Sequence, residues 1–476
     1  MKKEELFETL SDIDENKIKQ AREYKGKNGA KIYRWATAIV AAAAIALTAI
    51  FSPLFRNLGG GDYPGMKTVL ASYPAPTAAN LSSEEFVEDD NLWKWADKYF
   101  ELVEKTQGIS GEMLKYYTNL SGEVLVNGDE NTVLSPLNTY IAFAMLAETA
   151  EGNTRQQILD MLCASDIESL RKNVKALWES NYVDIPILKS LLANSLWLND
   201  SYKFNEKTLK LIADNYYASS FRGTPGNEAF NNALKKWTNE NTGNLLTEYT
   251  ENLNMDPSTV MAILSTIYYK ASWEKPFSEY STTSETFHGA KGDTTVQMMH
   301  NSDMTSYAET DKFIVIKIDL AESGNMFFYL PKEGVNVNEL ASDPDVLALA
   351  QNRNDSRWNM ITVDMSIPKF KVSSQTDLIP ALMALGVTDA LDYTIADFSP
   401  VTVGENELFL DKAEHAALVE IDEEGVTGAA YTALMMTEGA MLSTGTLEFV
   451  LDEPFMFAVT GADGSILFDG LVKNID

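Results

Sequence analysis

The sequence predicts an α+β fold with large sheets that are mostly antiparallel or mixed. From about residue 92 onward, helical and strand-like stretches follow one another without the regular strand–helix–strand rhythm of parallel α/β proteins. Several strand-like runs, such as 187–198 and 326–330, are apolar on consecutive residues, which indicates strands buried on both faces. Hydrophobic residues make up 45% of the chain and charged residues 22%, the composition of a globular protein.

An uncharged stretch near the N-terminus predicts a single transmembrane helix over 34–55. No charge occurs between Arg34 and Arg56, and about 21 helical residues span roughly 31 Å, the thickness of a bilayer core. A cleaved signal peptide is the alternative. More than thirty polar, mixed-charge residues (1–33) precede the stretch, which is longer than the usual basic region of a signal peptide. We therefore expect a signal anchor that stays in place.

The flanking charges predict the orientation of this helix. Lys25, Lys27, Lys31 and Arg34 lie on its N-terminal side, whereas Arg56 is the only cation immediately beyond it. The positive-inside rule places the 1–33 tail in the cytoplasm and the rest outside the cell, with the chain in the cell membrane as a single-pass protein. If the signal were cleaved, the protein would be secreted.

Glycine, proline and acidic residues are frequent in 56–91, which predicts a flexible linker. The folded domain then occupies 92–476. Within it, helices are expected at 111–120, 136–150, 154–162, 205–217, 228–241 and 376–385. Strands are expected at 187–198, 260–269, 313–318, 326–330, 360–367, 416–421, 447–451, 455–459 and 466–468.

Charge and histidine content exclude several classes of function. A net charge of −31 leaves no basic surplus for nucleic acid or for a broad polyanion-binding patch. His288, His300 and His415 are the only histidines, and none has a second His or Cys at ligand spacing. We expect no metal, no cofactor and no Ser-His-Asp hydrolase, and hence no enzyme. The single cysteine, Cys163, follows a helix-like pattern and is expected to be a buried, unreactive thiol.

The most unusual stretch is 423–437, close to the C-terminus. It lies between the strand-like runs 416–421 and 446–451, and from 425 to 437 it contains neither charge nor proline. Exposed loops are ordinarily rich in both. This composition indicates a segment that must at some stage become a strand.

Short motifs are spread along 92–476, and any one of them alone would be weak. They are 131–137, 151–157, 193–197, Trp237 with 241–243, 268–273 with 276–277, Phe287, 296–299, 368–370, 385–386, 396–399, 415–416, 454–455 and 468–474. In their order and spacing these motifs together resemble the serpin family.

This resemblance implies a serpin fold with three β-sheets, about nine helices and an exposed reactive-centre loop at about 423–446. It also implies a suicide-substrate inhibitor, which we expect to be a monomer. The partner would be a serine protease that cleaves the loop, becomes covalently attached as an acyl-enzyme, and is carried along as the loop inserts into the large sheet. A non-inhibitory serpin that binds or scaffolds at the cell surface is the alternative.

The resemblance assigns a hinge to the first part of the loop. A strand inserted into the sheet would alternate between core and solvent, with the even-numbered residues from Val426 to Met436 facing the core. All of these are uncharged, as insertion requires. The family usually has threonine where this chain has Val426, a residue of similar volume. The hinge comprises Glu423, Glu424, Gly425, Val426, Thr427, Gly428, Ala429 and Ala430.

The resemblance implies a reactive bond between Gly439 and Ala440, where the family's spacing from the hinge would place it. The same spacing counted back from Pro454 gives a position about four residues further on. Met436, Met441 and Leu442 are kept as alternates. The region contains no Arg or Lys, which disfavours trypsin-like proteases. Elastase-like enzymes are expected first, and chymotrypsin- or subtilisin-like enzymes second.

Control of sheet opening is expected at the family's shutter and breach positions. These correspond to Ser135, Asn138, Ser265, Trp273 and His415. Asn138 stands where the family has a second serine, and Ser265 stands where it has an asparagine. The two polar groups are exchanged, and a buried hydrogen-bonded cluster is still expected.

Overall fold

A computed structural model describes residues 63–64, 66–70, 89–185, 188–352, 355–404, 407–426 and 445–475. The expected cytoplasmic tail and the expected transmembrane helix, 34–55, lie outside these residues. In the part of the chain that is described, no helix is long and apolar enough to cross a membrane.

The helices lie mainly in the first half of the folded body. The described residues contain α5 (Asp89–Glu112), α6 (Leu114–Val124), α7 (Pro136–Thr149), α8 (Gly152–Met161), α9 (Ile167–Asn181), α10 (Glu206–Tyr216), α11 (Glu228–Asn241), α12 (Thr247–Thr250), α13 (Pro344–Gln351) and α14 (Ile379–Ala384). Short 3₁₀ helices are η2 (Glu279–Ser281), η3 (Val337–Ser342) and η4 (Asp389–Leu391). The ten α-helices of this part of the chain compare with about nine expected.

The larger part of the core is built from two sheets. Sheet A has eight strands in the order β1-β5-β4-β6-β14-β13-β12, with β3 beside β4. Its members are β1 (Lys67–Leu70), β3 (Val183–Ile185), β4 (Leu188–Asn199), β5 (Ala218–Gly223), β6 (Met261–Ser272), β12 (Phe370–Asp377), β13 (Glu414–Ile421) and β14 (Gly425–Val426). Only β4 and β5 run parallel, so this sheet is mixed, as the sequence predicts.

Sheet B has nine strands in the order β15-β11-β8-β9-β10-β16-β17-β2, with β7 beside β8. Its members are β2 (Thr132–Leu134), β7 (Thr283–Gly289), β8 (Gly292–Glu309), β9 (Phe313–Asp319), β10 (Asn325–Pro331), β11 (Asn359–Pro368), β15 (Thr446–Val450), β16 (Phe455–Thr460) and β17 (Ile466–Val472). The expectation of three sheets is therefore wrong for the described residues. The 18-residue β8 pairs with β7, β11 and β9, and so joins two groups of strands into one sheet.

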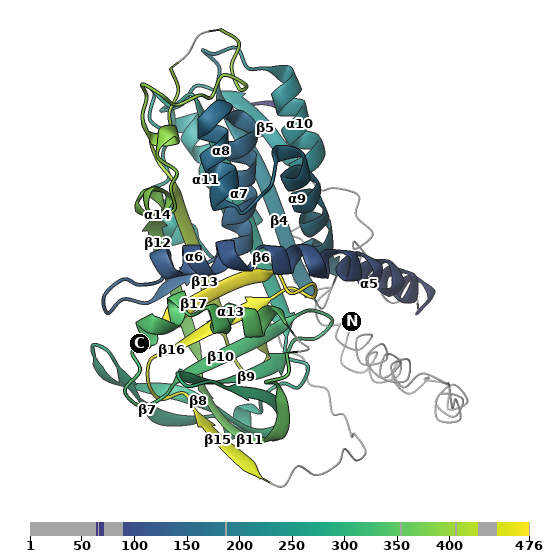
Figure 1. Cartoon of the computed structure of the whole chain (residues 1–476), viewed down its shortest axis with the longest axis vertical. Coiled ribbons are helices and arrows are strands. Elements are labelled where there is room, and N and C mark those ends of the chain that lie inside the picture. The colour runs from purple at the N-terminus through teal and green to yellow at the C-terminus, as the bar shows by residue number, and fades with distance from the viewer. Residues whose placement is uncertain are drawn as a thin grey trace, which may run out of the picture.

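The core lies where the two sheets face each other. Tyr269 of β6 contacts Phe468 of β17 with ring centroids 6.5 Å apart, and Phe370 of β12 contacts Phe457 of β16 at 5.6 Å. Helices α7 to α11 gather around sheet A in the upper part of Figure 1, and strands β7, β8, β11 and β15 form the opposite end. Sheet A is therefore covered by helices along much of its length.

The N-terminal segment is part of the fold rather than only a linker. Strand β1 lies within the stretch predicted as a flexible linker, 56–91, yet it pairs antiparallel with β5 at the edge of sheet A. For residues 63–64 and 66–70 the linker prediction is wrong. This part of the chain packs on the main body, and the Tyr63 side chain is only 5% exposed.

The environment of Cys163 also differs from the prediction. The residue is exposed, not buried. Helix α8 ends at Met161, and Cys163 has a positive φ of 55°, in the left-handed conformation that commonly ends a helix. The chain reverses at this point, and the side chain leaves the apolar face that the helical pattern would have given it.

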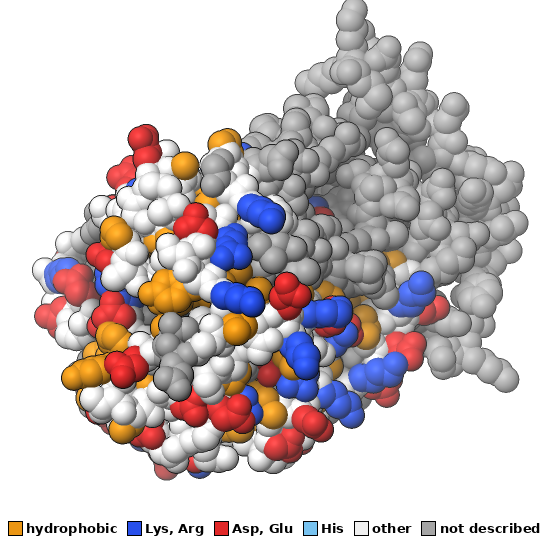
Figure 2. Space-filling model, turned by 90° about the horizontal axis from the view of Figure 1, so that it is seen from above, with side chains coloured by type: hydrophobic (Ala, Val, Ile, Leu, Met, Phe, Trp, Pro, Cys, Tyr) orange, Lys and Arg blue, Asp and Glu red, His pale blue; other side chains and the backbone are white. Residues whose placement is uncertain are grey.

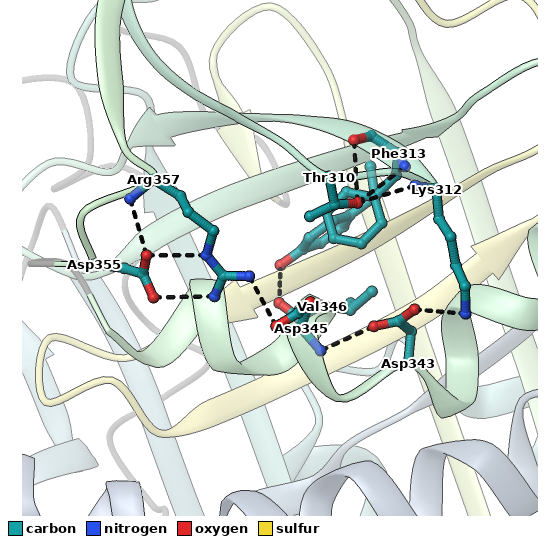
Figure 3. A network of polar contacts seen from close by, with 9 residues as sticks. Thr310, Lys312, Phe313, Asp343, Asp345, Val346, Asp355 and Arg357 are labelled. Carbon is teal, nitrogen blue, oxygen red and sulfur yellow. Dashed lines mark hydrogen bonds and ion pairs between the residues drawn. The ribbon is translucent and has the colours of Figure 1, made fainter.

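A network of ion pairs holds the loops at one edge of sheet B (Figure 3). Lys312 Nζ lies 2.9 Å from the Asp343 carboxylate, and Arg357 pairs with both Asp355 and Asp345 at 3.0 and 2.8 Å. Asp343 also caps α13 by accepting a hydrogen bond from the Asp345 N–H. These contacts tie α13 to the strands on both sides of it.

Charge is unevenly distributed over the surface. Figure 2 looks from above onto the end of the molecule that carries the helices and shows a band of Lys and Arg side chains there. Asp and Glu side chains lie within and around this band, so the face carries charges of both signs.

Candidate functional site

The hinge is already part of sheet A. Strand β14 lies between β6 and β13, where Gly425 pairs with Ser272 and Val426 pairs with Ala271 on one side and Ile421 on the other. Val426 is 2% exposed, so its side chain lies in the core. The sequence predicts an exposed loop from about 423, whereas the first two strand positions are in place in the uncleaved chain.

Glycine is required at the first of these positions. A Cβ atom on Gly425 would lie 2.2 Å from the Ala271 carbonyl oxygen and 2.8 Å from the Ser272 Cα. Both are backbone atoms of β6, which cannot move aside as a flexible side chain can. The hinge therefore approaches β6 more closely than any residue with a side chain could.

A tight turn connects β13 to β14. The Asp422 carboxylate accepts hydrogen bonds from the N–H groups of Glu424 and Gly425 at 2.9 and 3.2 Å. The Asp422 N–H donates to the Gly425 carbonyl at 3.1 Å. A short acidic side chain that binds N–H groups two and three residues ahead stabilises such a reversal.

Glu423 is the best-anchored residue of the hinge. It is 7% exposed, and its two carboxylate oxygens lie 2.7 Å from Lys369 Nζ and 2.8 Å from Thr282 Oγ1. Burial raises the pKa of Glu423, but the hydrogen bonds from Lys369 and Thr282 outweigh it and lower the pKa below the ordinary value. The ionised carboxylate therefore joins β12 and the loop after η2 to the hinge.

Trp273 covers the turn from the side of β6. It is 1% exposed, its Nε1 donates to the Asp422 carbonyl at 2.8 Å, and its backbone N–H donates to the Glu424 carbonyl at 2.9 Å. Burial and the nearby Asp422 raise the pKa of the Glu424 carboxyl. The structure thus brings the predicted breach residue Trp273 into direct contact with the hinge.

The other four predicted shutter residues form two pairs at the start of α7. The Ser135 N–H donates to His415 Nε2 at 3.0 Å, and Ser135 Oγ donates to the Leu467 carbonyl at 2.6 Å. Asn138 donates through Nδ2 to the Ser265 carbonyl at 3.1 Å, and the Ser265 hydroxyl donates to Asn138 Oδ1. His415 belongs to β13 and Ser265 to β6, so one helix end is bonded to both sides of the place where β14 lies.

His415 is neutral in this environment. Burial lowers its pKa from 6.5 to about 4. Its Nε2 accepts a hydrogen bond from a backbone N–H, so the ring proton is on Nδ1. Protonation would remove this acceptor and place a charge in the core.

The predicted reactive bond and the rest of the hinge lie outside the described residues. This applies to Thr427, Gly428, Ala429 and Ala430, to Gly439 and Ala440, and to the alternates Met436, Met441 and Leu442. The chain is described again from Gly445, and β15 pairs parallel with β11 from Thr446. Hence the two ends of the loop lie in different sheets.

Sequence reasoning missed three residues of this site: Lys369, Thr282 and Asp422. Lys369 stands in a motif that was noted without a role, and its position just before β12 was its only signal. Nothing in the sequence around Thr282 indicated contact with a residue 141 positions away. Among the described residues, no group of three or more His, Cys, Asp or Glu side chains is placed to hold a metal ion.

Comparison with known proteins identifies this arrangement. A family model described as "Serpin (serine protease inhibitor)" matches residues 113–475, more than half of the chain. An uncharacterised serpin-like protein of Thermococcus kodakarensis is 27% identical over 74% of this chain and 82% of its own length. Serine proteinase inhibitor 1 of vaccinia virus is 27% identical over 73% of this chain and 96% of its own.

Solved structures share the fold. The native state of tengpin, a thermophilic serpin, has a TM-score of 0.68 at 24% identity and covers 76% of this chain and 93% of its own. Human thyroxine-binding globulin in complex with its hormone has a TM-score of 0.66 at 24% identity and covers 79% of this chain and 99% of its own.

Proposed function

Because the chain belongs to the serpin family, we propose that it inhibits serine proteases by loop cleavage, acyl-enzyme formation and strand insertion. Membership of the family indicates an inhibitor rather than an enzyme. A protease serine would attack the carbonyl of Gly439 and form an ester with it, while the amine of Ala440 leaves. Insertion of the freed loop into sheet A would then carry the acylated protease away before water can hydrolyse the ester.

The observation that carries this proposal is the incomplete ladder between β6 and β13. These strands are 12 and 8 residues long, but β14 between them has two residues in the described part of the chain. Backbone N–H and C=O groups of sheet strands are strong hydrogen-bonding groups, and a longer inserted strand would pair more of them. Insertion therefore lowers the free energy of the molecule.

The register of β14 specifies what a longer strand would contact. Val426 pairs with Ala271 and Ile421, so continuing the same antiparallel register sets Thr432 opposite both Ser265 and His415. A hydroxyl residue would thus reach the two strands that α7 holds. Because Val426 faces the core, Gly428, Ala430 and Thr432 would face it too, and all three are small enough to enter.

The same register supports the count of the reactive bond from the hinge. Strand β6 begins at Met261, which the register would set opposite Met436. Gly439 lies three residues beyond, so its carbonyl would leave the sheet at the far end. We propose an elastase-like target first, and a chymotrypsin- or subtilisin-like target second, because no cationic side chain is near this bond.

Incubation with an elastase-like protease tests the mechanism. We expect a covalent complex that survives SDS denaturation, and a released peptide whose mass corresponds to a start at Ala440. Cleavage of all the protein with the protease left active would reject the inhibitory function. A peptide that begins elsewhere would keep the mechanism and move the bond.

Two loop variants test insertion itself. Gly428→Pro removes a ladder N–H, and Ala430→Arg puts a charge on the core face, so both should turn the inhibitor into a substrate. Ala433→Arg is the matched control, because the register sets position 433 on the solvent face opposite Glu414. Unchanged inhibition by the first two variants would contradict insertion.

A non-inhibitory binding or scaffold protein is the second candidate. It is favoured by the hinge already lying in the sheet and by the likeness to thyroxine-binding globulin, whose name states a binding function. Heat resistance separates the two functions. An inhibitory chain nicked in the loop should gain many degrees in melting temperature, whereas a chain without insertion should not.

We also propose that residues 34–55 anchor the chain in the cell membrane, with the N-terminus in the cytoplasm and the serpin domain outside; secretion after cleavage is the alternative. The uncharged stretch and the flanking lysines support this. Protease added to intact cells should digest the serpin domain of membrane-bound protein. Recovery of the protein from the medium with its N-terminus beyond residue 55 would establish secretion instead.

A further inference from the structure

The segment before the main body holds an aromatic side chain against two strands and a helix. The Tyr63 ring lies edge-on to Phe221 of β5 with centroids 5.2 Å apart and contacts Trp197 of β4 at 6.1 Å. Its hydroxyl donates to Glu240 of α11 at 3.1 Å, and Lys236 Nζ lies 5.5 Å from the ring centroid. Burial and the neighbouring Glu240 raise the Tyr63 pKa, so the hydroxyl stays protonated as a donor.

Tyr63 completes the packing of α11 on sheet A. Trp197 of β4 also contacts Phe230 and Trp237 of α11, with centroids 5.8 and 6.4 Å away. Tyr63 adds a further ring to this cluster from outside the main body. The interface between α11 and the sheet is therefore closed by a residue that precedes α5.

The sequence makes room for the segment. A Cβ atom on Gly223, the last residue of β5, would lie 2.7 Å from Met66 Sδ. Lys67 and Thr68 of β1 then pair with Arg222 and Phe221. The docked segment is thus held by main-chain pairing, by Met66 beside a glycine, and by Tyr63.

Helix α11 lies beside the path of the inserting strand. Gly243, two residues after α11, packs so closely on Tyr268 of β6 that a Cβ atom there would be 2.4 Å from the ring. Alternation along β6, where Ile267, Tyr269 and Ala271 are buried in the core, puts Tyr268 on the outer face. The register of β14 would set Ala429 opposite Tyr268. A strand that enters at this point would pass next to the end of α11 and require it to shift.

We propose that residues 63–64 and 66–70 act as an intramolecular brake on loop insertion. By tying α11 to the β4–β5 edge, the docked segment raises the barrier to the shift that the entering strand requires. Release of the segment, by cleavage or by a pull on the preceding chain, would lower that barrier. This inference rests on the loop insertion of the proposed function.

The test measures how fast the intact protein converts without protease into a heat-resistant, inactive form. Tyr63→Ala removes the ring and should speed the conversion by about tenfold or more. Tyr63→Phe keeps the ring, loses the bond to Glu240, and should give a smaller increase. Lys67→Ala is the matched control in β1, since its side chain is exposed, and should leave the rate unchanged.

Wild-type protein cleaved in the loop distinguishes failure of the proposed function from failure of the brake alone. If nicking produces no heat-resistant form, the proposed function fails and the brake with it. If nicked wild type becomes heat-resistant but intact Tyr63→Ala converts at the wild-type rate, only the brake is overturned. Equal acceleration by Lys67→Ala would also overturn it, because the effect would then not depend on the Tyr63 contacts.

Discussion

In sheet B every residue of the central strands β16 and β17 is buried. In sheet A the strand between the long strands β6 and β13 is β14, of which two residues are described. The side-chain contacts of the two sheets also differ. Phe457 of β16 is fully buried against Phe370, and α13 is fixed to the edge of sheet B by the ion pairs of Figure 3. Near the hinge, sheet A is held by polar contacts, among them the Lys369–Glu423 pair, the hydrogen bond from Trp273 and the contacts of α7.

The difference indicates how one chain can be both stable and ready to rearrange. In the described residues, no strand of sheet B is a short strand between two long ones, so we expect this sheet to stay unchanged. In the proposed mechanism sheet A would rearrange, because a longer strand would pair more of its backbone groups. Changes in sheet B should therefore affect the intact and the loop-cleaved forms alike, and changes near β14 should affect mainly the intact form.

The largest effect is expected from Phe457→Ala in sheet B. Loss of a fully buried ring should cost about 3–5 kcal/mol in the free energy of unfolding. Urea unfolding should give the same loss for intact and cleaved protein. A loss confined to the intact form would contradict the view of sheet B as a common rigid part.

The next effect concerns pH, with opposite signs in the two sheets. In sheet A, burial lowers the pKa of His415 to about 4, so the unfolded chain takes up a proton that the folded chain does not. Stability should fall as pH drops from about 6.5 to about 4, by up to about 3 kcal/mol. His415→Gln should remove this loss.

In sheet B, burial raises the pKa of Asp469 to about 7, although a hydrogen bond from Ser121 opposes the shift. The folded chain keeps a proton that the unfolded chain releases, so stability should fall as pH rises from about 4 to about 7, by up to about 4 kcal/mol. Asp469→Asn should flatten that part of the profile. Urea midpoints at pH 5 and pH 8 measure both slopes, and a variant profile parallel to that of the wild type would reject the assignment for that residue.

Gly425→Ala should have an intermediate effect confined to sheet A. The added methyl group meets the Ala271 carbonyl and should cost about 1–3 kcal/mol, which expels the hinge from the sheet. In the proposed mechanism insertion would begin at this residue, so more of the protein should be cleaved as a substrate. The ratio of covalent complex to cleaved product at a fixed protease concentration measures this, and an unchanged ratio would show that the hinge need not be seated.

The smallest effect is expected from Lys369→Met. It leaves the buried Glu423 carboxylate without its cation and should destabilise the intact form by about 1–2 kcal/mol, because the Lys369 side chain is itself partly exposed to solvent. Lys371→Met is the control on β12, because Lys371 pairs with Glu420 at 3.4 Å in a largely exposed setting worth less than about 1 kcal/mol. Equal thermal shifts for both variants would mean that the buried pair does not hold the hinge.

Periodicity predicted those elements whose residues are apolar throughout or on one face. Helix α11 was placed at its observed bounds, β4 within one residue and β6 within three residues. Strand β8 was not predicted, because many of its side chains are Thr, Ser, Asp or Asn and half-exposed, so it lacks an apolar run. The expectation of three sheets came from the family resemblance, and the pairings of β8 with β7, β11 and β9 join two of them into one.

The site was predictable where a motif marks it. His415, Ser135 and Trp273 stand in recognisable segments, and alternation from the hinge put Val426 on the core side. Lys369 and Thr282 could not be assigned, since their role depends on which distant residue lies opposite them. Likewise, whether Gly425 and Val426 pair in sheet A or lie in an exposed loop depends on the difference in free energy between these two positions. The pattern of apolar and polar residues does not give that difference.

The docking of Tyr63 also changes how far the molecule could reach from a membrane. If residues 34–55 hold the chain in a bilayer, only seven residues, 56–62, separate the anchor from Tyr63, and seven extended residues span at most about 25 Å. If Tyr63 and β1 were released, the connecting chain would run from residue 56 to the start of α5 at Asp89 and could extend over about 110 Å. Because β5, the partner of β1, lies at the opposite end from β15, a docked molecule would stand close to the surface with β15 at its far end.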